Sequence, residues 1–330
     1  MYQRVNQILE QYPFEVAEAG KIRGAVVCVT DHGLKLLKEY KGSEARADFL
    51  YKVLLYLRTE KERRVDCIVR TREDRTVAVD VDETVYYVRD WYEGRECDTK
   101  NRDDILRAIR QLAWLHTDLR AYQGEVPDYL IQRKDNLLLE NQKHSRELRK
   151  IKNYISGKRK RNEFEAAYLR EYGRFAEQAE GIMELQERRL KDAVETELYG
   201  ICHGEFNQHN VLFSREGCAV VNFEKACFDV QVGDLGNFMR KILEKHNWNL
   251  GLGMDMLGAY QKIRSLAGSE LSQLYIRLAY PEKFWKIANR YYNSGKVWGC
   301  GRSMEKLKKL VEQEEAKESF LNLISHNLLF

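Results

Sequence analysis

The segment from Ile201 to Gly236 constrains the fold of this chain more than any other stretch. It begins with a short apolar run and continues into a loop with closely spaced hydrogen-bonding side chains, namely His203, Glu205, Asn207 and Asn210. Two β-rich runs follow, Val211–Phe213 and Ala219–Phe223, with a Ser-Arg-Glu-Gly turn between them. A strand, a polar loop and a hairpin in this order hold several side chains rigidly at one cleft. The segment therefore predicts a functional site on a β-scaffold.

Length and composition predict a folded chain without a membrane span. The 330 residues are 44% hydrophobic, which suffices for two lobes with cores of their own. The net charge is only +4, from 55 basic and 51 acidic residues, which says little about nucleic acid, and we expect no nucleic-acid partner. No long apolar run occurs, and the N-terminus MYQRVNQILEQY lacks the apolar core of a signal peptide. The seven cysteines are scattered without a C-x-x-C pair, which indicates a reducing compartment and neither a zinc site nor a disulfide framework.

The polar loop resembles a known catalytic motif. Its spacing H-G-E-x-x-x-x-N, with N-F-E eleven residues later, is similar to the loops of the aminoglycoside phosphotransferase and choline-kinase-like branch of the protein kinase fold. That branch has H-G-D-x-x-x-x-N followed by D-F-D or D-W-E. Two acids differ here, because Glu205 stands at the position of the base and Asn222 at that of a metal-binding Asp. The resemblance implies an α+β, two-lobed protein kinase-like fold, with a small β-rich N-terminal lobe and a large helical C-terminal lobe.

Residues 1–93 fit the small lobe, with a hinge at about 88–94. Strands are predicted at Phe14–Ala19, Ala25–Thr30 and Leu34–Tyr40, and an Asp-His-Gly turn joins the last two. The third strand carries Lys38, the candidate for nucleotide phosphates, although a surface lysine is an equally simple interpretation. A helix is predicted from Ser43 to Thr59, with Ser43 as its N-cap. Its only candidate partner for Lys38 is Glu44, which we interpret instead as a surface acid at the first turn.

The predicted hinge sequence, Asp90-Trp91-Tyr92-Glu93-Gly94, joins a strand to a helix. Its backbone, with Trp91 and Glu93, is the candidate site for adenine. Packing between the lobes is the simpler interpretation of Trp91, and both interpretations can hold together.

Residues 94–330 fit the large lobe, which contains the loop segment 201–236 and a helical hairpin at 133–197. The first arm of the hairpin is strongly basic and the second is acidic, which favours pairing between the arms. Docking of an anionic partner on the basic arm is the alternative interpretation. His144 interrupts an apolar stripe on this arm, where it either lines a substrate pocket or serves as a satisfied packing group.

Further motifs resemble the CotS-type spore coat proteins of endospore-forming bacteria over nearly the whole chain. They are W-Y-E-G at the hinge, H-S-R-E-L and N-E-F-E in the hairpin, D-L-x-x-F-M-R-K-I-L-E-K at 234–245 and P-E-K-F-W-K-I-A-N-x-Y-Y-N at 281–293. This resemblance implies assembly with other coat proteins in the mother-cell cytoplasm and a final location in the spore coat.

By resemblance to the kinase-like branch, the loop residues have defined roles. Glu205 would be the base and His203 a brace of the loop, while Asp234 would support the loop from a helix start. Asn210, Asn222 and Glu224 would be the metal-binding set, and ATP and Mg²⁺ would be the cofactors of an active enzyme. An Asn at 222 weakens a Mg²⁺ site because this hard ion favours carboxylate oxygen.

Three hypotheses follow from these changes. The first is a coat protein with little or no phosphoryl transfer, in effect a pseudokinase that serves assembly. The second is an active phosphotransferase in which Glu224 replaces Asn222 as a metal ligand, on the premise that residues 222 and 224 share one face of a strand. The third is a nucleotide-binding regulator.

Overall fold

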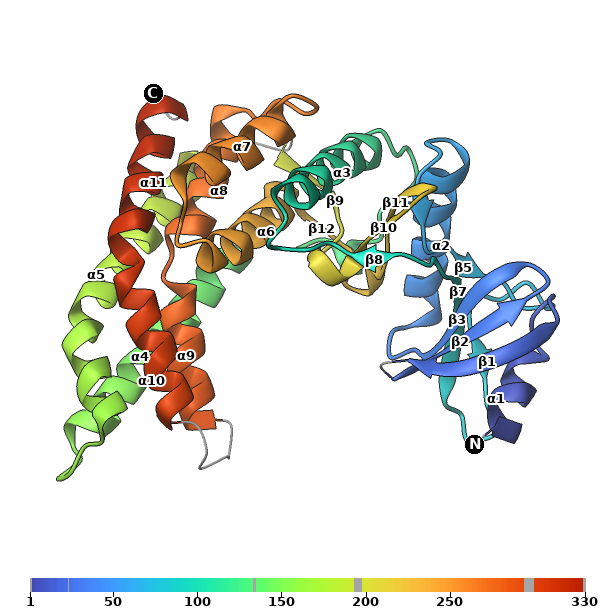
Figure 1. The fold of residues 1–330 in the computed structure, drawn as a ribbon, viewed down its shortest axis with the longest axis horizontal. Coiled ribbons are helices and arrows are strands. Elements are labelled where there is room, and N and C mark those ends of the chain that lie inside the picture. The colour runs from blue at the N-terminus through green and yellow to red at the C-terminus, as the bar shows by residue number, and fades with distance from the viewer. Residues whose placement is uncertain (1, 23, 133–134, 193–197, 294–299, 329–330) are drawn as a thin grey trace. The chain divides into compact units, whose positions relative to one another are not determined.

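The computed structural model describes residues 2–22, 24–132, 135–192, 198–293 and 300–328 (Figure 1). The chain forms two compact units. The first combines Met1–Ile131 with Gly200–Phe228, and the second combines Gln132–Tyr199 with Asp229–Phe330. The lobe boundary at residue 93 and the hinge at 88–94 stay predictions, since the compactness of these units does not test them.

The main sheet of the first unit has the order β1-β2-β3-β7-β5, and β6 also pairs with β7. The strands are β1 (Val16–Ile22), β2 (Ala25–Thr30), β3 (Gly33–Glu39), β5 (Ile68–Val69), β6 (Ala78–Val79) and β7 (Val85–Asp90). All their pairings are antiparallel. In β3 and β7, Lys38 lies directly opposite Tyr87, and Leu36 lies opposite Arg89. Because direct partners and alternate residues share a face, this register gathers Lys38, Tyr87 and Arg89 on one face of the sheet.

Three helices accompany this sheet. They are α1 (Tyr2–Leu9), α2 (Glu44–Thr59) and α3 (Arg102–Arg120). Buried Ile8 and Leu9 of α1 pack with Cys28, Leu37 and Val88 of the sheet. Ser43 caps α2, because its side chain accepts a hydrogen bond from the Arg46 amide at 3.3 Å. This is the cap that the sequence predicted.

A second sheet joins segments that are distant in the sequence. Its order is β4-β11-β10-β8, formed by β4 (Arg64–Val65), β11 (Gly217–Val220), β10 (Val211–Ser214) and β8 (Arg95–Glu96). The pairing of β11 with β4 is parallel, while β10 pairs antiparallel with both β11 and β8. A short ladder of β9 (Tyr199–Cys202) and β12 (Cys227–Val230) completes the strands.

The predicted strand through residues 222 and 224 is wrong. Strand β11 ends at Val220, and Asn222 has left-handed backbone angles, φ 71° and ψ 58°. Phe223–Lys225 then forms a 3₁₀ turn, η4. Asparagine adopts the left-handed region more readily than most residues, which suits it to this bend. The side chains of Asn222 and Glu224 therefore do not share a strand face, and the premise of the two-ligand metal site is lost.

The second unit is helical. Its helices are α4 (Asn136–Ser156), α5 (Glu163–Asp192), α6 (Val232–Lys245), α7 (Leu250–Gln261), α8 (Gly268–Ala279), α9 (Glu282–Asn293), α10 (Cys300–Glu312) and α11 (Glu314–Leu328). A core cluster draws Leu148 from α4, Phe164, Tyr168 and Phe175 from α5, Phe284 from α9 and Leu307 from α10. These four helices run side by side in Figure 1. Helices α4 and α5 occupy the basic and acidic arms of the predicted hairpin.

No helix in the described part of the chain is both long and apolar enough to cross a membrane. Within the same described ranges, the cysteines Cys28, Cys67, Cys97, Cys202, Cys218 and Cys227 are free thiols.

Candidate functional site

His203 holds the polar loop from its buried start. Its side chain lies at the end of β9, and its Nδ1 accepts a hydrogen bond from the Glu205 amide at 3.2 Å. Because Nδ1 accepts, the proton of the neutral ring is on Nε2, which donates to the Val221 carbonyl at 3.0 Å. The ring also packs against Phe223, with centroids 4.5 Å apart. One side chain thus connects the loop to the chain after β11.

Gly204 is required by close packing as well as by backbone geometry. Its φ is +78°, in the left-handed region that disfavours residues with a Cβ. A Cβ at this position would also lie 2.6 Å from the Lys225 carbonyl carbon. The glycine of the H-G-E motif therefore lets the loop pass directly over the turn η4.

Two asparagines fix the backbone at Glu205. The side-chain amides of Asn207 and Asn210 each donate to the Glu205 carbonyl at 2.9 Å. This leaves the Oδ1 atom of Asn210 available as an oxygen ligand, while Oδ1 of Asn207 caps η3 (Gln208–Asn210) by accepting from the His209 amide. The Glu205 side chain is exposed. The loop thus presents a carboxylate from a backbone that several hydrogen bonds hold in place.

Asn222 is positioned through its backbone. Its amide donates to Oδ2 of Asp66 at 2.8 Å, and Asp66 is fully buried. The same carboxylate oxygen forms an ion pair with Arg89 at 2.5 Å. Burial raises the pKa of Asp66 to about 6, against the opposing effects of the Arg89 charge and the Asn222 amide. Asp66 and Arg89 thus form the buried end of a charged network beneath the turn.

Glu224 is the centre of that network. Its Oε1 accepts from Nζ of Lys38 at 2.7 Å and from the Tyr87 hydroxyl, and it lies 3.9 Å from Arg89 Nη2. Burial opposes ionisation of the carboxyl, but the hydrogen bonds from Lys38 and Tyr87 and the charge of Arg89 outweigh it. The pKa of Glu224 is therefore lowered. Glu224 is a carboxylate held by two cations and one hydroxyl.

Helix α2 meets the site through an arginine. Arg46 donates to the carbonyl oxygens of Glu224 at 3.0 Å and Ala226 at 2.6 Å, which clamps the turn η4 from outside. Glu44, two residues earlier, instead forms a two-bond ion pair with Arg75. The sequence analysis interpreted Glu44 as a surface acid and not as the partner of Lys38, and these contacts agree with that interpretation.

A resident Mg²⁺ does not fit this arrangement. Among its proposed ligands Asn210, Asn222 and Glu224, only Glu224 carries a charge, and Lys38 and Arg89 already compensate it. No group of three or more His, Cys, Asp or Glu side chains suited to a metal ion occurs in the described ranges. Mg²⁺ favours carboxylate oxygen, and neighbouring ammonium and guanidinium groups repel it.

The other predicted site residues lie outside this cluster. The Trp91 amide donates to the Leu34 carbonyl at 2.9 Å, and Glu93 is exposed. Asp234 lies in the second unit, buried in the first turn of α6. Their roles in adenine binding and loop support stay predictions.

His144 packs within the second unit. Its ring stacks on Trp285, with centroids 3.5 Å apart, and burial lowers its pKa. Trp285 in turn donates to Glu147 at 2.6 Å. The proposed place of His144 in a substrate pocket stays a prediction.

Sequence reasoning missed Arg46, Asp66, Tyr87 and Arg89. One signal was present, because Arg89 directly follows the apolar sequence V-Y-Y-V at 85–88 and a buried charge needs a partner. Nothing in the sequence indicated that the partner would be Asp66, which lies between the strands β4 and β5.

Known proteins resemble this chain over nearly its full length. Spore coat protein S of Bacillus subtilis (strain 168) is 23% identical over 340 residues, covering 98% of this chain and 95% of that protein. An aminoglycoside phosphotransferase from Alicyclobacillus acidocaldarius subsp. acidocaldarius DSM 446 has a TM-score of 0.85 at 19% identity, over 98% of this chain and 96% of its own.

Two other solved structures are more distant. The amicoumacin kinase hAmiN, in complex with AMP-PNP, Ca²⁺ and Ami, has a TM-score of 0.63 at 12% identity, over 96% of this chain and 93% of its own. The choline kinase from Cryptosporidium parvum Iowa II has a TM-score of 0.54 at 13% identity, over 100% and 98% of the two chains. At such identities the similarity shows the fold alone, and it confirms the predicted kinase-like fold.

The family model described as "Spore coat putative kinase YutH" matches residues 5–324. This match agrees with the CotS-type resemblance that the sequence motifs predicted. The chain has a kinase-like fold and belongs to the spore coat family that this model describes.

Proposed function

We propose that this protein is a component of spore coat assembly in which the phosphotransferase site has lost phosphoryl transfer. In this proposal it acts in the mother-cell cytoplasm, with other coat proteins as partners, and ends in the coat. Family membership supports the coat context. The ion pair between Lys38 and Glu224 is the observation that supports the proposed loss of phosphoryl transfer.

The ion pair argues against nucleotide binding in two ways. Lys38 is the candidate for contacting the phosphates of ATP, but its ammonium group is bound by a carboxylate. Glu224 is the only charged candidate for a metal ligand, and its charge is compensated. A nucleotide would have to separate this pair. Its metal ion would also bind without the carboxylate ligand that an Asp at position 222 would provide. Charge neutralisation is most of what a phosphotransferase site supplies, so both effects weaken catalysis.

An active Mg·ATP-dependent phosphotransferase is the alternative. The hydrogen bonds around Glu205 and Asn210 favour it, because they hold a carboxylate and an amide oxygen ready at the loop. A similar fold in hAmiN has been crystallised with AMP-PNP and Ca²⁺. In this alternative Glu205 is the base for a small-molecule or protein hydroxyl, and Glu224 exchanges Lys38 for the metal ion.

A thermal-shift assay with ATP, with and without Mg²⁺ or Mn²⁺, tests the proposal. Binding to the folded state raises the unfolding midpoint, so we expect no shift at millimolar ATP. A shift together with release of the γ-phosphate would refute the proposal and support the active enzyme. A shift without turnover would instead support a nucleotide-binding regulator.

Two variants sharpen this test. If Glu205→Asp combined with Asn222→Asp creates ATPase activity that the parent lacks, the site is a decayed catalytic one. If the parent binds ATP with a metal ion, Glu224→Ala should abolish the metal dependence, and an unchanged dependence would remove Glu224 as a substitute ligand.

A further inference from the structure

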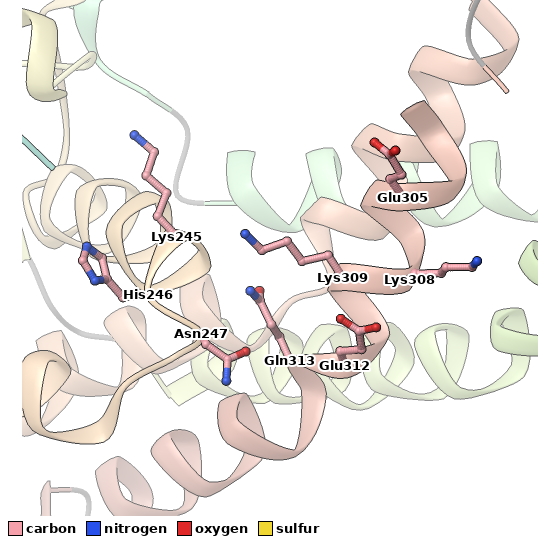
Figure 2. Close-up of a pocket in the computed structure, with 8 residues that line it drawn as sticks. All are labelled: Lys245, His246, Asn247, Glu305, Lys308, Lys309, Glu312 and Gln313. Atoms are coloured by element: carbon pink, nitrogen blue, oxygen red, sulfur yellow. The ribbon is translucent and has the colours of Figure 1, made fainter. Parts of the chain in front are cut away.

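A groove in the second unit lies between the end of α6 and helix α10 (Figure 2). Its volume is about 400 Å³, and Lys245, His246 and Asn247 line one wall. Glu305, Lys308, Lys309, Glu312 and Gln313 line the other. Figure 2 shows the side chain of Lys309 extending across the groove toward the α6 wall, while Lys308 extends away from it. The two neighbouring lysines therefore differ in direction although they share a helix and a charge.

The cationic surface continues along α10 beyond the groove. Arg302, Lys306 and Lys309 follow each other at steps of four and three residues, which places them on one face of the helix. The flank of the helix beside this face is buried, with Leu307 and Leu310 in the core. Within the described residues, Arg302, Lys306 and Lys309 have no carboxylate at ion-pair distance. They form a stripe of uncompensated positive charge.

A neighbouring helix adds to this charge. The pKa of Lys306 is lowered, first by burial and then by the positive charges of Arg290, Lys283 and Arg302. Lys283 is partly compensated by Glu244 at 2.6 Å, whereas Arg290 is exposed. The chain thus tolerates mutual repulsion among these groups, which a bound anionic partner would relieve.

We infer that the α10 stripe (Arg302, Lys306 and Lys309) and the adjoining groove form a docking site for an acidic segment of another polypeptide. The groove walls favour a peptide over a nucleic acid. Glu305 and Glu312 repel a uniformly charged polyanion, whereas a peptide carries acidic side chains at intervals. The amides of Asn247 and Gln313 provide the hydrogen-bonding groups that a peptide backbone requires.

This inference deepens the proposed role in coat assembly, and it rests on that role for the choice of a protein as partner. The docking site lies in the second unit, and its binding is measured without nucleotide. A finding of kinase activity would therefore refute the proposed function without deciding whether this site binds.

Fluorescence anisotropy of a labelled peptide of alternating glutamate and alanine, with the full chain at low salt, tests the inference. We expect saturable binding that weakens as salt rises through the physiological range. Lys309→Gln should weaken binding about three- to fivefold, which is the usual effect of one partly exposed charge pair. The triple variant R302Q/K306Q/K309Q should weaken it further than Lys309→Gln alone, because it removes all three positive charges of the stripe.

Lys308→Gln is the matched control, because it removes the same charge from the same helix, and the Lys308 side chain, although it lines the groove, extends away from the α6 wall. It should leave the affinity within about twofold. The inference is overturned if the peptide does not bind, or if Lys308→Gln and Lys309→Gln weaken binding equally. Tighter binding of an oligothymidylate of the same length would overturn the assignment to an acidic polypeptide. Circular dichroism of each variant checks that the helices are intact.

Discussion

Replacing Glu224 by glutamine removes the central negative charge of the first unit while conserving the size of the side chain. The carboxylate accepts from Lys38 at 2.7 Å and from Tyr87, and Arg89 is 3.9 Å away. The glutamine oxygen still accepts a hydrogen bond, but it does not compensate the two cations. We therefore expect Glu224→Gln to destabilise the turn η4 and the strands β3 and β7 that face it.

The size of this effect follows from the exposure of the partners. A hydrogen bond to a charged group contributes about 1.5–3 kcal/mol. The Lys38 side chain is 34% exposed and that of Glu224 is 26% exposed, so solvent screens the pair and the lower end applies. Arg89 keeps its ion pair with Asp66, which limits the further loss. We expect a cost of about 1.5 kcal/mol, roughly a tenfold rise in the local opening equilibrium.

Hydrogen exchange measured by mass spectrometry on peptides spanning residues 218–228 reports this local equilibrium. The cost should depend on pH with a defined sign. The pKa of Glu224 is lowered from its ordinary value of 4.5, so its stabilising effect is present above about pH 4.5 and is lost as the pH falls through the folded-state pKa. The difference between the parent and Glu224→Gln should therefore be full at pH 7 and shrink toward zero in strong acid.

Glu216→Gln is the control, because Glu216 also pairs with an arginine at 2.7 Å but is 76% exposed. It should change the opening free energy by less than about 0.5 kcal/mol. Equal effects of the two substitutions would contradict the reasoning. So would a Glu224→Gln variant that matches the parent at pH 7, because the network would then contribute nothing to stability.

Three more predictions concern stability. Gly204→Ala should cost more than about 2 kcal/mol in urea unfolding because of its φ and the close Lys225 carbonyl, whereas Gly20→Ala, with open space around it, should stay within about 0.5 kcal/mol. Asp66→Asn should cost about 3 kcal/mol by removing the nearer carboxylate of the buried Arg89 and leaving only Glu224 at 3.9 Å, and a small loss would show that Glu224 compensates Arg89 sufficiently. Because burial lowers the pKa of His144, the folded state resists its protonation, and stability falls as the pH drops below about 6.5. His144→Phe should therefore reduce the fall of the thermal midpoint between pH 7.5 and 5.5, and an unchanged fall would assign it to other groups.

Sequence analysis can reach those parts of the site that depend on local spacing. The hydrogen bonds of His203, Asn207 and Asn210 join residues that are a few positions apart or lie on either side of one hairpin. They therefore depend mainly on the spacing of residues within the motif. The same holds for the cap of α2 at Ser43, since Ser43 and Arg46 are three positions apart. Such features follow from short-range geometry and need no knowledge of the tertiary fold.

The missed parts depend on contacts between distant segments. Val221 and Asn222 read as a continuation of the strand, yet β11 ends at Val220, and the amide of Asn222 is held by Asp66, 156 positions away. The sequence does not show that Tyr87 and Arg89 lie next to Glu224, and for that reason Glu224 was assigned to a metal ion. Their position depends on the β3–β7 register, which side-chain patterns alone do not determine.

The second sheet of the first unit also sets the order in which this protein completes its fold during synthesis. Strands β4 and β8 are both synthesised by residue 96, whereas their partners β11 and β10 lie between residues 211 and 220. At roughly 5–20 residues per second, the early segment waits about 6–25 s for the chain to reach them. During that interval Asp66 lacks its contact with Asn222, and Tyr92 lacks the cluster of Leu212, Ala219 and Val221. Arg89 likewise lacks Glu224. A nascent chain halted before residue 200 therefore has an incomplete first unit. The first unit can complete its fold only after the helices α4 and α5 of the second unit have been synthesised.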